Sequence, residues 1–85
     1  AGSVFKNNRD FGKPSGKIVD ECGLRGNAVG DAQIAPWHGN FIINRENASA
    51  QDIRELVENT KMTVAEKTGF NLECEILFVD GGIVR

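Results

Sequence analysis

The amino-acid sequence predicts an α+β domain with the element order β-α-β-β-α-β, in which a small, largely antiparallel sheet packs against two helices. Hydrophobic residues recur at helical spacing in residues 14–22 and 49–69, and four other stretches alternate or run together as strands do. Short segments rich in Gly, Asn and Pro separate these stretches, with no linker between them. The 85 residues are therefore expected to form one domain, residues 1–85.

The first half of the chain is predicted to contain two strands and a short helix. The opening run, residues 1–7, is prone to β structure and leads into a polar loop. Pro14 suits the first turn of a helix that reaches about Cys22, and Gly23 is placed to end it. Residues 27–35 alternate small or apolar side chains with polar ones, which is typical of a strand.

The second half is predicted to contain a buried strand, a long helix and a last strand. Phe41, Ile42 and Ile43 form the buried strand, and Leu72–Val79 alternates as the last one. The helix between them begins at Ser49, which forms a capping-box pattern with Asp52, and ends at Gly69. Its apolar face is predicted to consist of Ile53, Leu56, Val57, Thr60 and Val64. No element is assigned to the last three residues.

Charge and cysteine content exclude several classes of function. Ten Lys and Arg residues against twelve Asp and Glu residues give a net charge of −2, so we expect no nucleic-acid or membrane partner. Cys22 and Cys74 lie far apart without a CxxC pattern, which argues against a metal site. The chain shows no signal peptide and no long apolar run, and buried free thiols in the cytoplasm are the expectation.

Five motifs resemble, in the same order, the C-terminal domain of the MurB family. That family comprises the flavin-dependent UDP-N-acetylenolpyruvoylglucosamine reductases of peptidoglycan synthesis. The opening motif reads Gly-Ser-Val-Phe-Lys-Asn and is similar to the family's Gly-Ser-x-Phe-Lys-Asn-Pro signature. The other four motifs are residues 16–24, 29–34, 38–44 and 72–76.

The resemblance implies an oxidoreductase of cell wall biogenesis, and thus of cell shape and cell division. In the family, NADPH reduces FAD, and the flavoprotein then reduces the enolpyruvyl ether of UDP-N-acetylglucosamine enolpyruvate to UDP-N-acetylmuramate. The flavin domains lie N-terminal to the opening motif, and this chain has no glycine-rich cofactor-binding stretch. We therefore expect a substrate-binding domain that binds no FAD, NADPH or metal alone, is inactive in isolation, and works with the flavin domains of the same polypeptide.

The resemblance also implies two catalytic residues, Ser3 and Glu75. Ser3 matches the family's proton donor, and Glu75 matches the second glutamate of its Leu-Glu-x-Glu motif. From the residues alone, a serine near a terminus is usually structural, and one histidine is too little for a Ser-His-Asp hydrolase. Glu73, the first glutamate of that motif, is expected to be structural.

Four further residues are candidates for substrate binding: Lys6, Asn7, Arg25 and His38. The resemblance places the Lys-Asn pair beside the UDP-sugar, assigns Arg25 to the diphosphate and gives His38 a polar contact with the substrate. The simpler interpretation of Lys6 and Asn7 is two surface residues at the end of a strand. A lone histidine is likewise more often a surface or core residue than a ligand.

Two other functions remain open on the sequence. The chain could be a nucleotide-sugar binding module without redox chemistry, which predicts saturable binding of a UDP-sugar. It could also be a structural oligomerisation domain, which predicts concentration-dependent sedimentation and no response to ligand.

Overall fold

The computed structural model describes residues 4–75, 77–79 and 82–84, and within them it confirms the predicted α+β class. Two helices accompany a three-stranded antiparallel sheet, with strand order β1-β2-β3, and a two-stranded hairpin, β4-β5. The elements are η1 (Arg9–Phe11), α1 (Ser15–Glu21), β1 (Ala28–Val29), β2 (Ala32–Ile34), β3 (Ile42–Asn44), α2 (Ala50–Thr68), β4 (Leu77–Val79) and β5 (Gly82–Val84).

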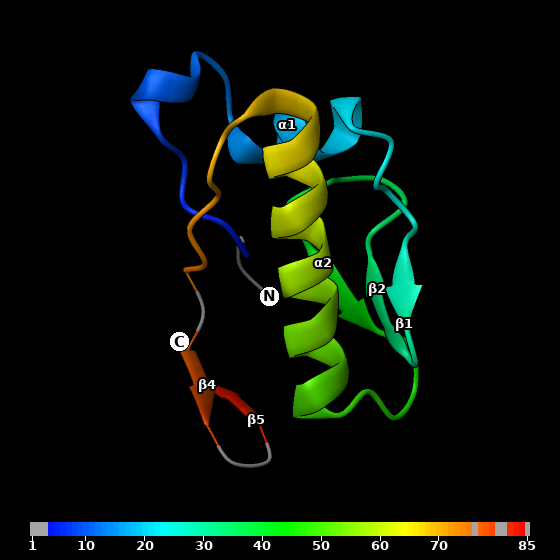
Figure 1. Ribbon diagram of the computed structural model, residues 1–85. Coiled ribbons are helices and arrows are strands. Elements are labelled where there is room, and N and C mark those ends of the chain that lie inside the picture. Colours follow the sequence, from blue (N-terminus) through cyan, green and yellow to red (C-terminus); the bar gives the residue numbers. More distant parts are fainter. Residues whose placement is uncertain (1–3, 76, 80–81, 85) are drawn as a thin grey trace.

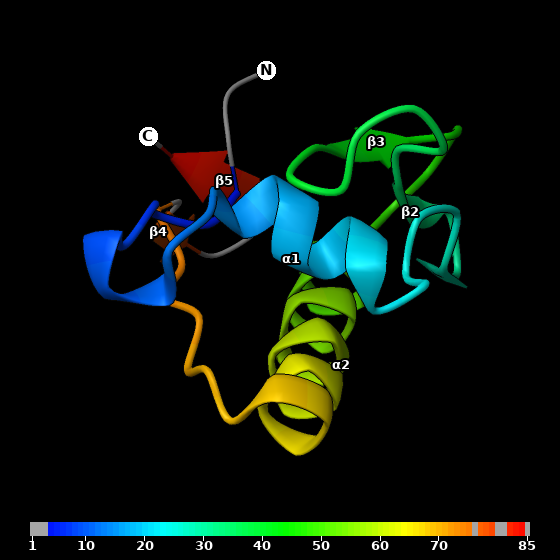
Figure 2. The same cartoon turned by 90° about the horizontal axis from the view of Figure 1, so that it is seen from above.

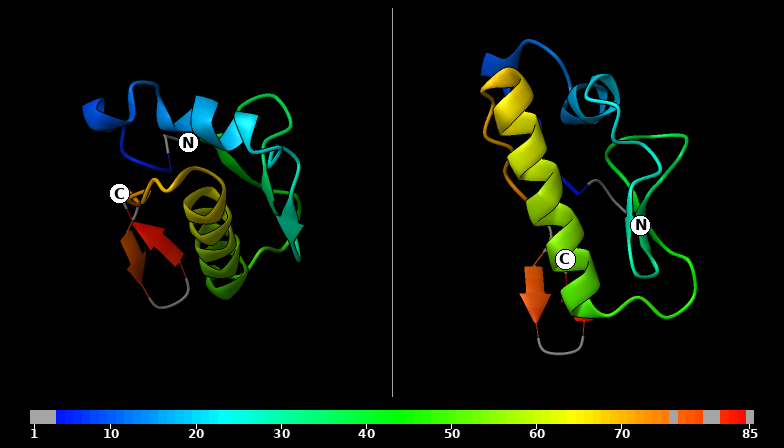
Figure 3. Two further views of the ribbon diagram at one scale, coloured as in Figure 1. Left: turned by 45° about the horizontal axis from the view of Figure 1, so that its top comes forward. Right: turned by 45° about the vertical axis from the view of Figure 1, so that its right-hand side comes forward.

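Helix α2 is the element against which the others pack. It contacts β1, β2, α1 and β4. The three-stranded sheet lies on one side of α2 and the β4-β5 hairpin on the other (Figures 1 and 2), an arrangement that two further views repeat (Figure 3). The other elements therefore pack against one face of α2, and the opposite face stays exposed to solvent.

Helix α2 has the ends and the buried face that the sequence predicts. The Ser49 hydroxyl accepts a hydrogen bond from the Asp52 N–H (3.0 Å), and the Asp52 carboxylate accepts one from the Ser49 N–H (3.2 Å). Gly69 ends the helix in the left-handed conformation, with φ +79°. The buried residues are the five predicted ones, Ile53, Leu56, Val57, Thr60 and Val64. A local capping signal and one apolar stripe thus suffice to specify this helix.

Helix α1 is one residue shorter at each end than predicted. Pro14 precedes its first residue in an extended conformation, which suits a residue without a backbone N–H. At the other end the Gly23 N–H donates to Asp20 (2.9 Å) and the Leu24 N–H donates to Val19 (3.3 Å). These two bonds, with Gly23 at φ +75°, form a Schellman motif that turns the chain sharply after α1.

The single strand predicted over residues 27–35 is wrong, because the structure has a hairpin there. Strands β1 and β2 pair antiparallel, with Val29 opposite Ala32, so the turn consists of Gly30 and Asp31. Gly30 adopts φ +56°, which an L side chain rarely allows, and a glycine in the first turn position favours such hairpins. Strand β3 pairs with the other side of β2.

The opening and closing strands are shorter than predicted. Val4–Lys6 pairs antiparallel with Glu73–Glu75 through one bridge, Phe5 to Cys74. The closing stretch then continues as a separate element, β4, which pairs with β5. Strand β5 lies in the C-terminal stretch, to whose last three residues the sequence analysis assigned no element.

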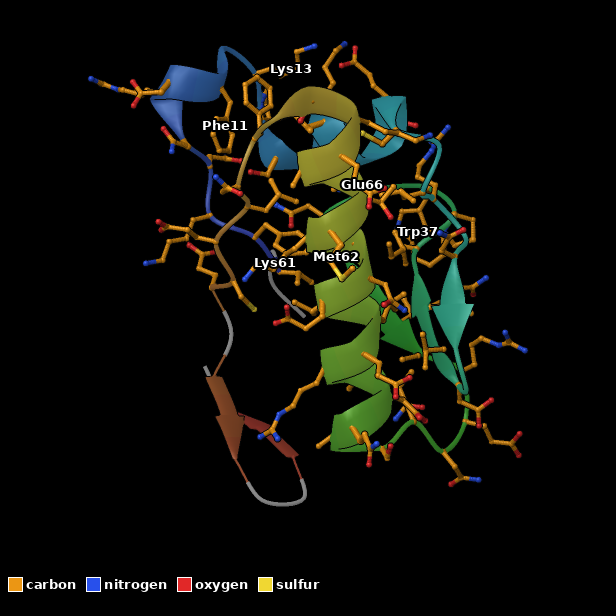
Figure 4. All side chains as sticks on the ribbon, viewed as in Figure 1. Phe11, Lys13, Trp37, Lys61, Met62 and Glu66 are labelled. Atoms are coloured by element: carbon orange, nitrogen blue, oxygen red, sulfur yellow. The ribbon has the colours of Figure 1, made fainter. Side chains whose placement is uncertain are left out.

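The core lies between α2 and the elements around it. Its most buried large side chains include Phe5, Ile18, Ile34 and Leu72. Among the residues whose burial is described, two large apolar side chains are exposed: Trp37 is 65% exposed and Met62, on α2, is 60% exposed (Figure 4). Within the described residues, no helix is both long and apolar enough to span a bilayer.

Candidate functional site

A groove of about 350 Å³ lies between η1 and the paired opening and closing segments. Most of the side chains around it are polar. The lining residues are Lys6, Asn7, Asn8, Arg9, Asp10, Phe11, Asn71 and Glu73. The groove therefore contains two of the predicted substrate-binding residues, Lys6 and Asn7.

The charges around the groove balance. Lys6 and Glu73 lie opposite each other where the two segments pair, because the Lys6 N–H donates to the Glu73 carbonyl oxygen (2.8 Å). Arg9 and Asp10 add one charge of each sign. Within the described part of the chain, neither Lys6 nor Arg9 forms an ion pair. The groove thus presents two unpaired cations to a ligand without being strongly positive.

The Asn7 side chain links the groove to helix α1. Its amide oxygen accepts a hydrogen bond from the Ser15 N–H (3.0 Å), at the first residue of the helix. The buried Ser15 hydroxyl in turn donates to the Lys6 carbonyl oxygen (2.6 Å). Among the described residues, the Asn7 NH₂ group has no hydrogen-bond acceptor. Its two N–H donors are therefore available to a ligand in the groove.

The wall formed by η1 is held by a capping hydrogen bond and a ring contact. The Asn8 side chain accepts a hydrogen bond from the Asp10 N–H (2.9 Å), and Gly12 ends the turn at φ +77°. The Phe11 ring stacks on Phe70, with ring centroids 4.5 Å apart. This contact joins the wall to the segment that follows α2.

Of the two predicted catalytic residues, Glu75 belongs to the paired segments. Ser3 lies outside the described residues. Glu75 is exposed, and its N–H donates to the carbonyl oxygen of Val4 (2.7 Å), the residue that follows Ser3 in the sequence. The closing segment is therefore held directly beside the start of the opening one.

Arg25 and His38 do not line the groove. Arg25 follows the C-terminal end of α1, whereas Asn7 binds its N-terminal end, and a helix of seven residues is about 10 Å long. The Arg25 guanidinium forms an ion pair with Asp20 (2.7 Å). The His38 Nδ1 accepts a hydrogen bond from the Asn40 N–H (3.0 Å), and its ring stacks on Phe41. Substrate binding by Arg25 and His38 stays a prediction.

One titratable group near α1 has a shifted pKa. The Lys13 ammonium donates a hydrogen bond to the Glu21 carboxylate (2.6 Å), which lowers the pKa of that carboxyl group. Both side chains are well exposed, so this ion pair contributes little to stability.

The sequence interpretation assigned no role to Asn40, which the structure shows to be a central contact. Asn40 is 4% exposed. It belongs to the loop before β3, and its side chain contacts the opening segment. The contact spans 35 residues of sequence, and no periodic pattern marks it. One signal was present in the sequence: Asn40 follows Gly39 and precedes a run of large apolar residues. An asparagine amide that is buried at such a position needs several hydrogen-bond partners.

The chain was compared with known proteins. Residues 1–79 match the family model described as UDP-N-acetylenolpyruvoylglucosamine reductase, C-terminal domain. A reductase of that name from Treponema denticola is 60% identical over 92% of this chain and 24% of its own length. The one from Borrelia garinii subsp. bavariensis is 51% identical over 93% of this chain and 26% of its own length.

A solved structure agrees with these sequence relatives. The crystal structure of UDP-N-acetylenolpyruvylglucosamine reductase (MurB) from Thermus caldophilus matches with a TM-score of 0.72 and 41% identity. The match covers 95% of this chain and 27% of that one, so the chain spans about a quarter of the length of the proteins it resembles. A family match over nearly all residues and a shared fold lead to one conclusion: the chain belongs to the UDP-N-acetylenolpyruvoylglucosamine reductase family, as a C-terminal domain.

Proposed function

We propose that this chain is the substrate-binding domain of a reductase that converts UDP-N-acetylglucosamine enolpyruvate to UDP-N-acetylmuramate. The reaction belongs to peptidoglycan synthesis and uses FAD and NADPH. The observation that carries the proposal is the pairing of Val4–Lys6 with Glu73–Glu75, which supports a joint role for Ser3 and Glu75. Cys22 and Cys74 form no disulfide, which fits a cytoplasmic enzyme.

The residues of this chain supply acid–base and binding groups. Ser3 donates a proton to the carbon that bears the ether oxygen, and Glu75 stabilises the enol form of the substrate as charge develops on its carboxylate side. Lys6 and the Asn7 NH₂ group bind oxygen atoms of the UDP-sugar from the groove. These roles require a hydroxyl, a carboxylate, an ammonium and an amide group at fixed positions, and they require no metal.

The groove does not fit a flavin. Phe11 is its one aromatic lining residue, and that ring already stacks on Phe70. The remaining lining side chains are charged or amide groups, which suit an anionic, oxygen-rich ligand better than an apolar ring system. We therefore assign the flavin, which supplies the hydride, to the other domains of the polypeptide, and we expect the 85-residue chain alone to be inactive and to bind no FAD or NADPH.

The proposal predicts that the two glutamates of the closing segment differ in function. In the full-length protein, Glu75→Gln should lower substrate-dependent NADPH oxidation by about 10²-fold, because one group that stabilises developing charge is lost. Glu73→Gln, compared at saturating substrate, is the control: it is the same change two residues away on an exposed side chain, and because Glu73 lines the groove it can change KM without changing this rate. Equal rates for the two variants, or a full-length wild type without this activity, would contradict the proposal.

A second prediction separates the two functions of the Asn7 amide. Asn7→Asp keeps the oxygen that binds the Ser15 N–H but replaces the NH₂ donor with a negatively charged oxygen. The KM for the UDP-sugar should rise about tenfold, the value of one hydrogen bond to a charged group, while the domain stays folded. Asn8→Asp places the same charge in the same groove and keeps its own bond to the Asp10 N–H. A similar KM for both variants would assign the effect to charge rather than to the Asn7 donor.

A further inference from the structure

The Asn40 side chain binds the opening segment as a neighbouring strand would. Its amide oxygen accepts hydrogen bonds from the N–H groups of Phe5 (2.7 Å) and Val4 (3.1 Å). Its amide nitrogen donates to the Phe5 carbonyl oxygen (3.0 Å). The Asn40 backbone carbonyl oxygen accepts a further bond from the Val4 N–H (2.9 Å). One buried residue thus satisfies three backbone groups of the opening segment.

The geometry of the pairing explains why these backbone groups need Asn40. Phe5 and Cys74 form a bridge whose two hydrogen bonds come from the flanking residues, from the Lys6 N–H and to the Val4 carbonyl oxygen. The N–H and C=O of Phe5 therefore point away from the closing segment. Phe5 is 2% exposed, so water cannot satisfy these groups cheaply. The Asn40 amide takes the place of the peptide group of an additional strand.

Val4 is hydrogen-bonded to one predicted catalytic residue, Glu75, and follows the other, Ser3, in the sequence. Its carbonyl oxygen accepts the hydrogen bond from the Glu75 N–H (2.7 Å). Its N–H belongs to the peptide bond that joins it to Ser3, and that N–H leaves the strand pairing to bind Asn40 instead. Asn40 therefore binds the N–H of the peptide unit that joins Val4 to Ser3.

We infer that Asn40 is a positioning residue for the reaction, which acts by fixing the direction in which the chain leaves Val4 towards Ser3. The inference rests on the proposed function, because it needs Ser3 as the proton donor. A proton donor must lie within hydrogen-bond distance of the carbon that it protonates, and a displacement of about 1 Å can cost about 10²-fold in rate. Asn40 itself touches neither substrate nor cofactor in this scheme.

The test is a double-mutant cycle in the full-length protein that combines Asn40→Ala with Ser3→Ala. Alone, Asn40→Ala should lower kcat for the enolpyruvyl substrate by about 10²-fold and leave flavin reduction by NADPH nearly unchanged. In the Ser3→Ala background the same change should cost almost nothing, because the group that it positions has already been removed. A purely structural defect would lower the rate equally in both backgrounds, and that result would overturn the inference.

Two further variants keep the result interpretable. Asn44→Ala is the matched control, because it also removes a hydrogen bond that a backbone N–H, that of Ala48, donates to an asparagine oxygen (3.0 Å), away from the opening segment. It should leave kcat unchanged. Asn40→Asp covers the case in which Asn40→Ala does not fold: a protonated carboxyl can accept from Val4 and Phe5 and donate to the Phe5 carbonyl oxygen, whereas a carboxylate cannot donate.

The Asn40→Asp variant should therefore regain kcat as the pH falls through the pKa of the buried carboxyl group, relative to wild type at each pH. A ratio of the two rates that does not change with pH would overturn the inference. The failure of the proposed function is distinguishable from that of the inference. If Ser3→Ala alone leaves turnover unchanged, both are wrong; if Ser3→Ala is impaired and folded Asn40→Ala is not, only the role of Asn40 is wrong.

Discussion

Replacing Ser3 with alanine in the full-length protein is expected to lower turnover of the enolpyruvyl substrate by about 10³-fold, the effect of losing one positioned general acid. After a hydride has added to one carbon of the enolpyruvyl double bond, the neighbouring carbon must gain a proton. Without the Ser3 hydroxyl, solvent has to supply that proton from an unfixed position. Reduction of the flavin by NADPH does not involve this proton and should stay within about twofold of wild type.

The measurement compares the two half-reactions by stopped-flow absorbance of the flavin, at equal flavin content. Ser49→Ala serves as the control serine, because Ser49 caps α2 and has no contact with the groove. It should lower the unfolding midpoint without changing either half-reaction. If Ser3→Ala turns over substrate at the wild-type rate, the opening motif is only the end of a strand, and a binding module without redox chemistry becomes the better interpretation.

Replacing Phe5 with alanine is expected to destabilise the 85-residue chain by about 3–5 kcal/mol, the usual cost of truncating a buried phenylalanine. Phe5 is 2% exposed and belongs to the hydrophobic core, and it also forms the bridge to Cys74. Domains of this size have a free energy of unfolding of about 5–15 kcal/mol, so the change removes a large part of it. We expect much of this variant to be unfolded at room temperature.

The free energy of unfolding is measured by urea titration, followed by circular dichroism. Trp37→Ala is the control, because it removes a larger aromatic ring that is 65% exposed. It should change the free energy of unfolding by less than about 0.5 kcal/mol. Similar losses for the two variants would mean that the opening segment is not part of the core.

Local signals predicted the helices well and long-range contacts poorly. The capping box at Ser49 and the apolar stripe of α2 lie within one element, and both were read correctly from the sequence. The hairpin at Gly30 was not predicted, because small or apolar residues alternate with polar ones in the same way in one long strand and in two short strands joined by a tight turn. The Gly-Asp pair was the signal that could have separated the two cases.

The candidate site shows the same division. The sequence placed Lys6 and Asn7 together because they are neighbours in the chain, and both line the groove. Arg25 does not line the groove, because α1 separates it from Asn7 both in the sequence and in the structure. The role of Asn40 could not be predicted from hydrophobic periodicity, because its hydrogen-bond partners are backbone groups about 35 residues away in the sequence. Only the fold brings these groups close to Asn40. Side-chain periodicity reports which face is buried, and it carries no information about such partners.

The pairing of Val4–Lys6 with Glu73–Glu75 also determines when this part of the domain can form. Helix α2 and the β1-β2 hairpin consist of contacts between near neighbours, whereas the Phe5 to Cys74 bridge joins residues close to opposite ends of the chain. Contacts of such large sequence separation form late, because the intervening chain must first lose its freedom. During synthesis on the ribosome, the opening segment therefore stays unpaired, with its apolar side chains exposed to solvent, until the closing segment has emerged. Because Asn71 and Glu73 line the groove, we expect a chain that stalls or is truncated before these residues to lack it even with α2 formed.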